Sequence, residues 1–173
     1  MTTAVVFVSI WILPTSPLDL LVKLDLLVIA ASLIVIFFSD LKYSLIPDEM
    51  VLTFTLGTAL FLFLTANRFV LTTNFFVGLL SSLALLLIVF ATKGRGLGLG
   101  DVKYVFPMGL LLGFPGAAVA FWVSFISGGT VALILVAMKL RSFKQTIPLG
   151  PFLVLGTIVA FFWSKNLLSI IGL

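Results

Sequence analysis

Two aspartates, Asp40 and Asp101, stand out because the chain around them is almost wholly apolar. Two carboxyl groups brought together in a low-dielectric site cannot comfortably both ionise, so one of them keeps its proton. Such a pair can act as general base and general acid at once. One group takes a proton from water while the other protonates the carbonyl oxygen of a peptide bond. If Asp40 and Asp101 meet, they can hydrolyse a peptide without a metal, a thiol or an imidazole.

The glycines before Asp101 suggest how backbone and acid are arranged. Gly94, Gly96, Gly98 and Gly100 alternate with other residues directly ahead of the acid. A carboxylate where a glycine-rich loop enters a membrane helix is costly, which indicates a function. The glycines would let the backbone approach an extended substrate and would permit positive φ angles beside Asp101.

Each acid also has a purely structural explanation, and these alternatives stay open here. Asp101 begins a predicted helix and could be its N-cap, and Asp48 could cap the helix that it begins. Asp40 lies near the C-terminal end of a helix, where an acid opposes the helix dipole. Its structural role would be a solvated ion pair with Lys42 or Lys103.

A further acid, Asp25, lies about two turns into the first predicted helix. An acid inside a membrane helix can be functional. We expect instead that Asp25 snorkels to the interface or pairs with a local partner such as Lys23.

The composition identifies an integral membrane protein. Hydrophobic residues make up 62% of the 173 residues and charged residues only 9%, whereas soluble domains are about 25% charged. A chain of this composition could not hide its apolar surface in water, so we expect the lipid bilayer as its partner. The net charge of +4 is interpreted as a topology signal and not as nucleic-acid binding.

The missing residue types exclude several chemistries. The chain has no cysteine and no histidine, which excludes disulfides, cysteine nucleophiles, and the commonest general base and metal ligand. We therefore expect no metal and no cofactor, and any acid–base work falls mainly to the six carboxylates.

The predicted fold is an all-α membrane bundle of about six transmembrane helices. Residues 1–16 form an apolar segment too short to span, which we expect to be interfacial or partly inserted, and residues 17–173 form the membrane domain. The predicted spans are residues 17–39, 48–66, 72–92, 101–112, 116–140 and 151–171.

Basic residues in the predicted loops indicate the orientation. The loops after the first, third and fifth spans carry seven of them, whereas the other two loops carry only Arg68. The positive-inside rule then places the seven-charge side in the cytoplasm and both termini outside. Asp40 and Asp101 lie on this same face and can meet. The seven residues are Lys42, Lys93, Arg95, Lys103, Lys139, Arg141 and Lys144.

Three strings in order resemble the peptidase domain of the type IV prepilin peptidases, a group that includes the archaeal preflagellin peptidases. They are DLKYSLIPD (residues 40–48), GLGDVK (98–103) and IPLGPFLVLG (147–156). The resemblance covers roughly residues 17–171. It implies a GxGD-type intramembrane aspartyl protease in which Asp40 and Asp101 are the catalytic aspartates. It also implies residues that bind substrate or support the site, namely Gly98, Gly100, Lys103, Pro47, Asp48, Pro148, Gly150 and Pro151.

The resemblance further implies the substrate and the compartment. Members of the family cut the short basic cytoplasmic leader from prepilin-like or preflagellin-like proteins at the membrane border, usually after a glycine. This places the protein in the cytoplasmic membrane. The larger bacterial enzymes also carry an N-terminal cysteine tetrad and N-methylate the new amino terminus. This cysteine-free chain, with some sixteen residues before its first predicted span, is expected to be a peptidase only.

The sequence leaves two other functions open. A small transporter or channel subunit could use Asp40 and Asp101 to bind ions or protons, but it would be expected to carry acids near the membrane midplane and a symmetry-related repeat. A catalytically inactive scaffold of a pilus assembly machine would be expected to have lost Asp40 or Asp101, and both are present.

Overall fold

The computed structural model describes residues 16–94, 97–138 and 148–171, and residues 164–171 by their helical backbone alone. All regular structure in these residues is helical, which confirms the predicted helical bundle. The predicted segment 1–16, apart from Ser16, lies outside the described residues, as do Arg95, Lys139, Arg141 and Lys144. The helices are α2 (Pro17–Tyr43), α3 (Asp48–Thr65), α4 (Arg68–Ala91), α5 (Leu99–Ala137) and α6 (Gly150–Ile171).

Local capping explains where two helices begin. The Ser16 hydroxyl accepts a hydrogen bond from the Asp19 amide at 3.1 Å, so α2 begins at Pro17 as predicted. The side chain of Asn67 accepts one from the amide of Val70 at 2.9 Å. This cap starts α4 at Arg68, four residues earlier than predicted.

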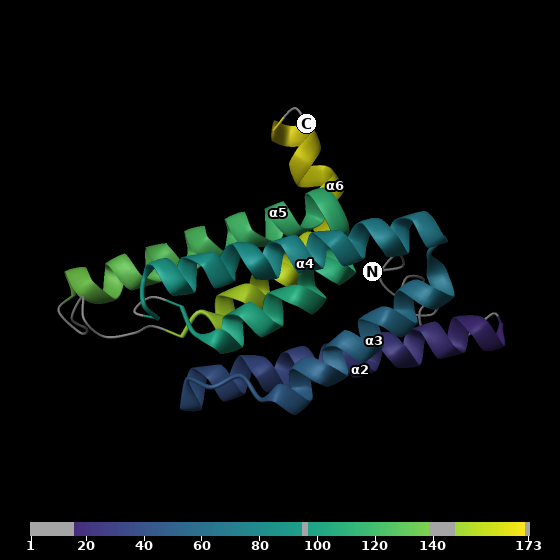
Figure 1. The fold of residues 1–173 in the computed structure, drawn as a ribbon, viewed down its shortest axis with the longest axis horizontal. Coiled ribbons are helices and arrows are strands. Elements are labelled where there is room, and N and C mark those ends of the chain that lie inside the picture. Colours follow the sequence, from purple (N-terminus) through teal and green to yellow (C-terminus); the bar gives the residue numbers. More distant parts are fainter. Residues whose placement is uncertain (1–15, 95–96, 139–147, 172–173) are drawn as a thin grey trace, which may run out of the picture.

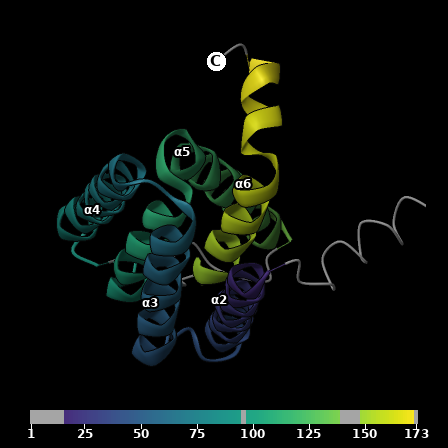
Figure 2. The ribbon, with the colours of Figure 1, turned by 90° about the vertical axis from the view of Figure 1, so that its right-hand side faces the viewer.

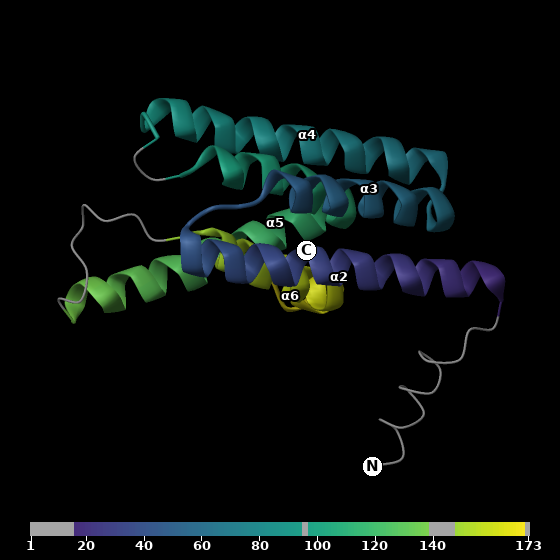
Figure 3. The ribbon, with the colours of Figure 1, turned by 90° about the horizontal axis from the view of Figure 1, so that it is seen from below.

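Helix α5 is broken at Gly113, which has φ 59° and ψ −172°, and at the extended Phe114. The break falls where the fourth and fifth spans were predicted to separate. Figures 1 and 3 show that the two segments of α5 run in opposite directions. A helix break inside a membrane leaves backbone carbonyls without their helical partners. The side-chain amide of Asn74 on α4 donates to the Leu110 carbonyl at 3.0 Å, which satisfies one of them.

The helices form a multi-pass membrane protein. Four of them (α2 to α5) are long and apolar enough to cross a bilayer, and Gly150–Trp163 of α6 is a shorter apolar helix. Large apolar side chains face outward, with Phe63 exposed to 76% and Phe90 to 71%. Exposed apolar surface of this extent indicates contact with lipid.

Helix α5 lies at the centre of the bundle and packs against α3, α4 and α6, while α2 packs against α3 and α6. Figure 2 shows α4 on one side of this arrangement and α2 with α6 on the other. The core includes fully buried Phe54, Tyr104, Met108 and Leu153. Glycines let α4 and α5 approach closely, since a Cβ on Gly109 would lie 2.7 Å from the Cα of Gly78.

One end of the bundle gathers the segments that carry the predicted site. Helices α2 and α4 end there, and α3, α5 and α6 begin there (Figure 1). We call it the carboxylate end because Asp40 and Asp101 both lie at it. Of the basic residues counted in the predicted loops, those that the structure describes divide as predicted: Lys42, Lys93 and Lys103 belong to this end and Arg68 to the opposite one. Their separation matches the predicted division of loop charges.

Candidate active site

Asp40 lies in the last turn of α2 and is only 5% exposed. Its carboxylate Oδ2 accepts a hydrogen bond from the amide of Gly150 at 2.8 Å. Gly150 is the first residue of α6, where helix amide groups lack internal partners, and the positive end of the helix dipole favours a carboxylate. The alternative of a solvated ion pair with Lys42 or Lys103 is wrong, because Asp40 is buried and both lysines have other contacts.

Asp101 lies in the first turn of α5 and is 8% exposed. Its Oδ2 accepts a hydrogen bond from the amide of Gly98 at 2.9 Å. Gly98 is therefore the N-cap residue of α5, and Asp101 caps the helix from the third helical position. The prediction that Asp101 is the N-cap is therefore wrong by three residues, because Gly98 holds that position. Asp101 nevertheless accepts a capping hydrogen bond, from the Gly98 amide.

The two carboxyl groups line one cleft of about 340 Å³ at the carboxylate end. The cleft joins the turn between α2 and α3 to the start of α5. Its lining residues are Asp40, Ser44, Leu45, Ile46, Asp48, Gly98, Leu99, Gly100, Asp101 and Lys103.

Six of the ten predicted site residues line this cleft, and four do not. Gly150 contacts Asp40 from α6 without lining the cleft. The other three, Pro47, Pro148 and Pro151, are not among its lining residues. Four lining residues were not predicted. They lie inside two of the quoted strings, at residues 40–48 and 98–103, so their place in these strings was the signal that could have identified them. These are Ser44, Leu45, Ile46 and Leu99.

A salt bridge crosses between two helices beside the carboxylates. The Lys103 Nζ of α5 lies 2.8 Å from both carboxylate oxygens of Asp48 on α3. Asp48 is not an N-cap: Pro47 holds that position without a side-chain hydrogen bond, and Asp48 is the first helical residue. The capping explanation of Asp48 is therefore wrong.

The glycines next to the acids allow neighbouring groups to approach closely, and they do not adopt unusual dihedral angles. Gly98 has φ −87° and ψ 158°, an extended conformation open to any residue. Positive φ occurs at Gly94 (71°), away from the acid, while Gly96 lies outside the described residues. A Cβ on Gly100 would lie 3.2 Å from the Cβ of Ile46, and a Cβ on Gly150 would lie 2.6 Å from Oδ2 of Asp40. Gly98 and Gly100, the described glycines beside Asp101, thus lack the positive φ that was expected there.

Asp25 differs from its predicted surroundings. It is 7% exposed, and its Oδ2 has no hydrogen-bond partner among the described residues. Lys23 pairs with Asp19 at 2.9 Å. Asp25 faces α3 at Gly57, where an added Cβ would lie 3.3 Å from its Oδ1. Fifteen residues along α2, about 22 Å at the helical rise, separate it from Asp40, so it has no part in the cleft.

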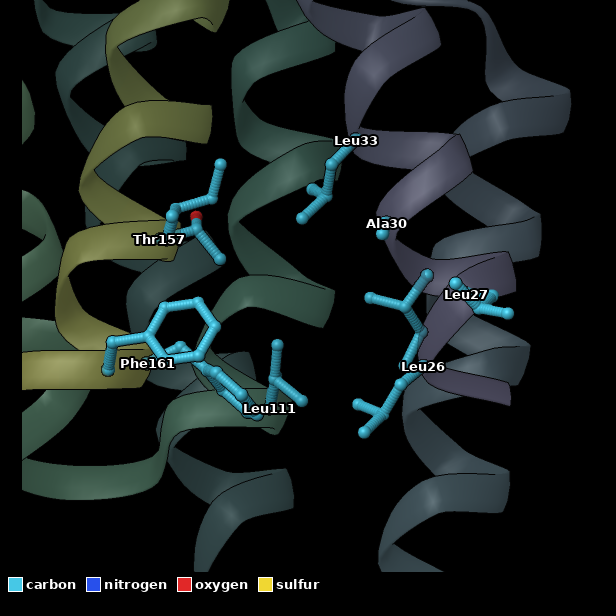
Figure 4. A pocket seen from close by; sticks show the side chains of 10 residues that line it. Leu26, Leu27, Ala30, Leu33, Leu111, Thr157 and Phe161 are labelled. Atoms are coloured by element: carbon cyan, nitrogen blue, oxygen red, sulfur yellow. The ribbon is translucent and has the colours of Figure 1, made fainter. Parts of the chain in front are cut away.

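A second cavity, of about 200 Å³, lies between α2, α5 and α6. Figure 4 shows Leu26 and Leu33 of α2 facing Phe161 of α6 across it. Its lining is apolar except for Thr157, whose hydroxyl is hydrogen-bonded to Tyr104 and to the Leu153 carbonyl. No carboxylate is among the residues that line this cavity.

Comparison with known proteins identifies the family. The sequence profile of the type IV leader peptidase family matches residues 27–133. This match covers more than half of the chain and includes Asp40 and Asp101. The chain belongs to the type IV leader peptidase family.

Curated proteins of this type IV leader peptidase family align with most of the chain. The chain is 33% identical to the prepilin leader peptidase/N-methyltransferase of Legionella pneumophila, over 79% of the chain and 49% of that protein. It is 27% identical to the protein of the same description from Bacillus subtilis, over 79% of the chain and 54% of that protein. The chain thus spans about half the length of these relatives. No solved structure matches it significantly.

Proposed function

We propose that this chain is an intramembrane aspartic-type endopeptidase that removes basic leader peptides from prepilin-like or preflagellin-like proteins. Asp40 and Asp101 are its catalytic pair. The observation that carries the proposal is that these two buried carboxyl groups line one cleft and that each accepts a backbone hydrogen bond, Asp40 from Gly150 of α6 and Asp101 from Gly98, the N-cap of its own helix. Membership of the type IV leader peptidase family supports a leader peptidase function independently of this geometry.

In the proposed reaction, one carboxylate takes a proton from water as the water oxygen attacks the scissile carbonyl carbon. The other carboxyl group donates its proton to the carbonyl oxygen. The tetrahedral intermediate then collapses. The first group returns its proton to the leaving nitrogen and the second regains one from the hydroxyl. One water is consumed, the carbon–nitrogen bond breaks, and the pair returns to its starting protonation.

The test is cleavage by the purified chain in liposomes. The substrate is a polypeptide with a short basic leader ending in glycine, followed by an apolar helix, and the products are identified by mass spectrometry. The expected result is a single cut after the leader. Intact substrate would overturn the proposal, provided that a prepilin leader peptidase of known activity cuts the same substrate under the same conditions.

We place the cleft on the cytoplasmic side of the membrane, because the loops at the carboxylate end carry most of the basic residues. Because the chain has no cysteine, single cysteines can report the orientation. Leu45 at the cleft and Phe69 at the opposite end are 59% and 75% exposed. With a membrane-impermeant thiol reagent outside intact cells, we expect labelling of Phe69→Cys and none of Leu45→Cys. The reverse pattern would contradict the orientation.

A further inference from the structure

The salt bridge between Lys103 and Asp48 joins the two parts of the chain that carry the cleft acids. Lys103 lies two residues after Asp101, in the first turns of α5. Asp48 begins α3, directly after the short turn that follows Asp40. The Lys103 Nζ lies 2.8 Å from each of the two carboxylate oxygens of Asp48, so it contacts both.

The turn between Asp40 and Asp48 is itself tied to the end of α2. The Ser44 amide donates to the Asp40 carbonyl at 2.8 Å. The Ser39 hydroxyl donates to the Leu45 carbonyl at 2.9 Å. A displacement of Asp48 relative to α5 would therefore act, through this turn, on the end of α2 where Asp40 lies.

On this basis we propose that the Lys103–Asp48 salt bridge is a positioning contact, which sets the separation of Asp40 and Asp101. This role rests on the proposed function of that pair. The alternative role for Asp48 is a direct contact with substrate. We favour positioning because both oxygens of the Asp48 carboxylate already accept from Lys103. Neither Lys103 nor Asp48 takes part in the proton transfers.

The exposure of the pair defines how large its effect can be. The side chains of Lys103 and Asp48 are 54% and 69% exposed, and exposed ion pairs add little to stability. Breaking the pair should therefore leave the protein folded. It should lower kcat by about two- to fivefold, the range that such a weak contact can supply.

The first test measures geometry and needs no activity. Leu45 and Leu99 line the cleft from its two sides and are 59% and 60% exposed. Spin labels on Leu45→Cys and Leu99→Cys, in this otherwise cysteine-free chain, report their separation by pulsed electron resonance. We expect one narrow distance distribution. Asp48→Asn or Lys103→Gln should broaden or shift it, and the combined Asp48→Lys and Lys103→Asp exchange should restore it.

Matched controls remove a nearby charge but keep the salt bridge. Glu49→Gln alters the neighbouring acid in the first turn of α3, and Lys42→Gln alters a lysine at the same end of the bundle. Both should leave the distance distribution unchanged. An identical distribution in Asp48→Asn, Lys103→Gln and the parent would overturn the positioning role, whether or not the chain cleaves a leader.

The second test separates positioning from substrate binding by kinetics on the leader substrate. A positioning contact predicts lower kcat with KM changed less than about twofold, and retention of kcat in Lys103→Arg, which keeps the charge. If KM rises while kcat and the label distances stay constant, the pair contacts substrate and our inference is wrong. If the parent chain cleaves nothing, the proposed function fails, while the distance measurement still decides the inference.

Discussion

The amide nitrogen of Gly150 lies 2.8 Å from Oδ2 of Asp40, although 110 residues separate the two in sequence. This hydrogen bond connects the third quoted string to the first. It places the start of α6 directly against one of the two acids. A residue with a side chain cannot replace Gly150 without moving Asp40, because an added Cβ would lie 2.6 Å from Oδ2.

Gly150→Ala should therefore lower leader cleavage between about tenfold and 100-fold, since displacement of a catalytic group by about 1 Å can cost two orders of magnitude. Gly129→Ala is the matched control, because an added Cβ there has no atom within 4 Å. Cleavage rates of both variants, normalised to folded protein, provide the measurement. Equal rates would show that the contact between Gly150 and Asp40 has no bearing on activity.

The two glycines before Asp101 should differ in their tolerance of alanine. Gly98 has an extended backbone, and its added Cβ would make an ordinary 3.5 Å contact with Asp101. The space around Gly100 is tighter, since an added Cβ there would lie 3.2 Å from the Cβ of Ile46. We expect Gly98→Ala to retain at least about half of the cleavage rate, because the Gly98 amide still donates to Asp101, and Gly100→Ala to retain less. The opposite order, measured on the same substrate, would contradict this account of the loop.

The buried hydrogen bond between Tyr104 and Thr157, 2.8 Å long, joins α5 to α6 behind the cleft. Thr157 also donates to the Leu153 carbonyl, so Tyr104→Phe leaves the threonine hydroxyl with a partner. Thr157→Val instead leaves the phenol of Tyr104 buried without its partner. We expect Tyr104→Phe to lower the free energy of unfolding by about 0.6 kcal/mol, which is typical of hydrogen bonds between membrane helices. Thr157→Val should lower it by about 1–3 kcal/mol.

Unfolding of the two variants in detergent measures this asymmetry. The double variant should lose less than the sum of the two single losses, because the orphaned phenol is absent from it. A larger loss for Tyr104→Phe than for Thr157→Val would show that the phenol bonds elsewhere when Thr157 is removed.

Much of the fold followed from local sequence signals. The first predicted span begins at residue 17, as α2 does, and the gap between the predicted spans 101–112 and 116–140 coincides with the break within α5. The prediction that Asp40 and Asp101 share one face rested on loop charges, and in the structure both line one cleft. These features depend on neighbouring residues or on composition, which a sequence displays directly.

Contacts between distant segments could not be predicted in this way. The helices are apolar on nearly every side, so no amphipathic stripe indicates which face turns inward. This is why Asp25 was expected to snorkel or to pair with Lys23, whereas α2 turns it against Gly57 of α3. The Lys103–Asp48 pair and the Gly150–Asp40 contact likewise depend on how α3, α5 and α6 pack together.

The central claim is that Asp40 and Asp101 together perform the hydrolysis. The most direct measurement is the cleavage rate of Asp40→Asn and Asp101→Asn in liposomes, with Asp25→Asn as the matched control. Asn keeps the shape of each side chain but cannot exchange the proton, and Asp25 is a buried acid of the same α2 helix that lies outside the cleft. We expect no detectable cleavage by either cleft variant, with folding intact, and nearly the parent rate from Asp25→Asn. Cleavage at the parent rate by either cleft variant, with its sequence verified by mass spectrometry, would contradict the claim.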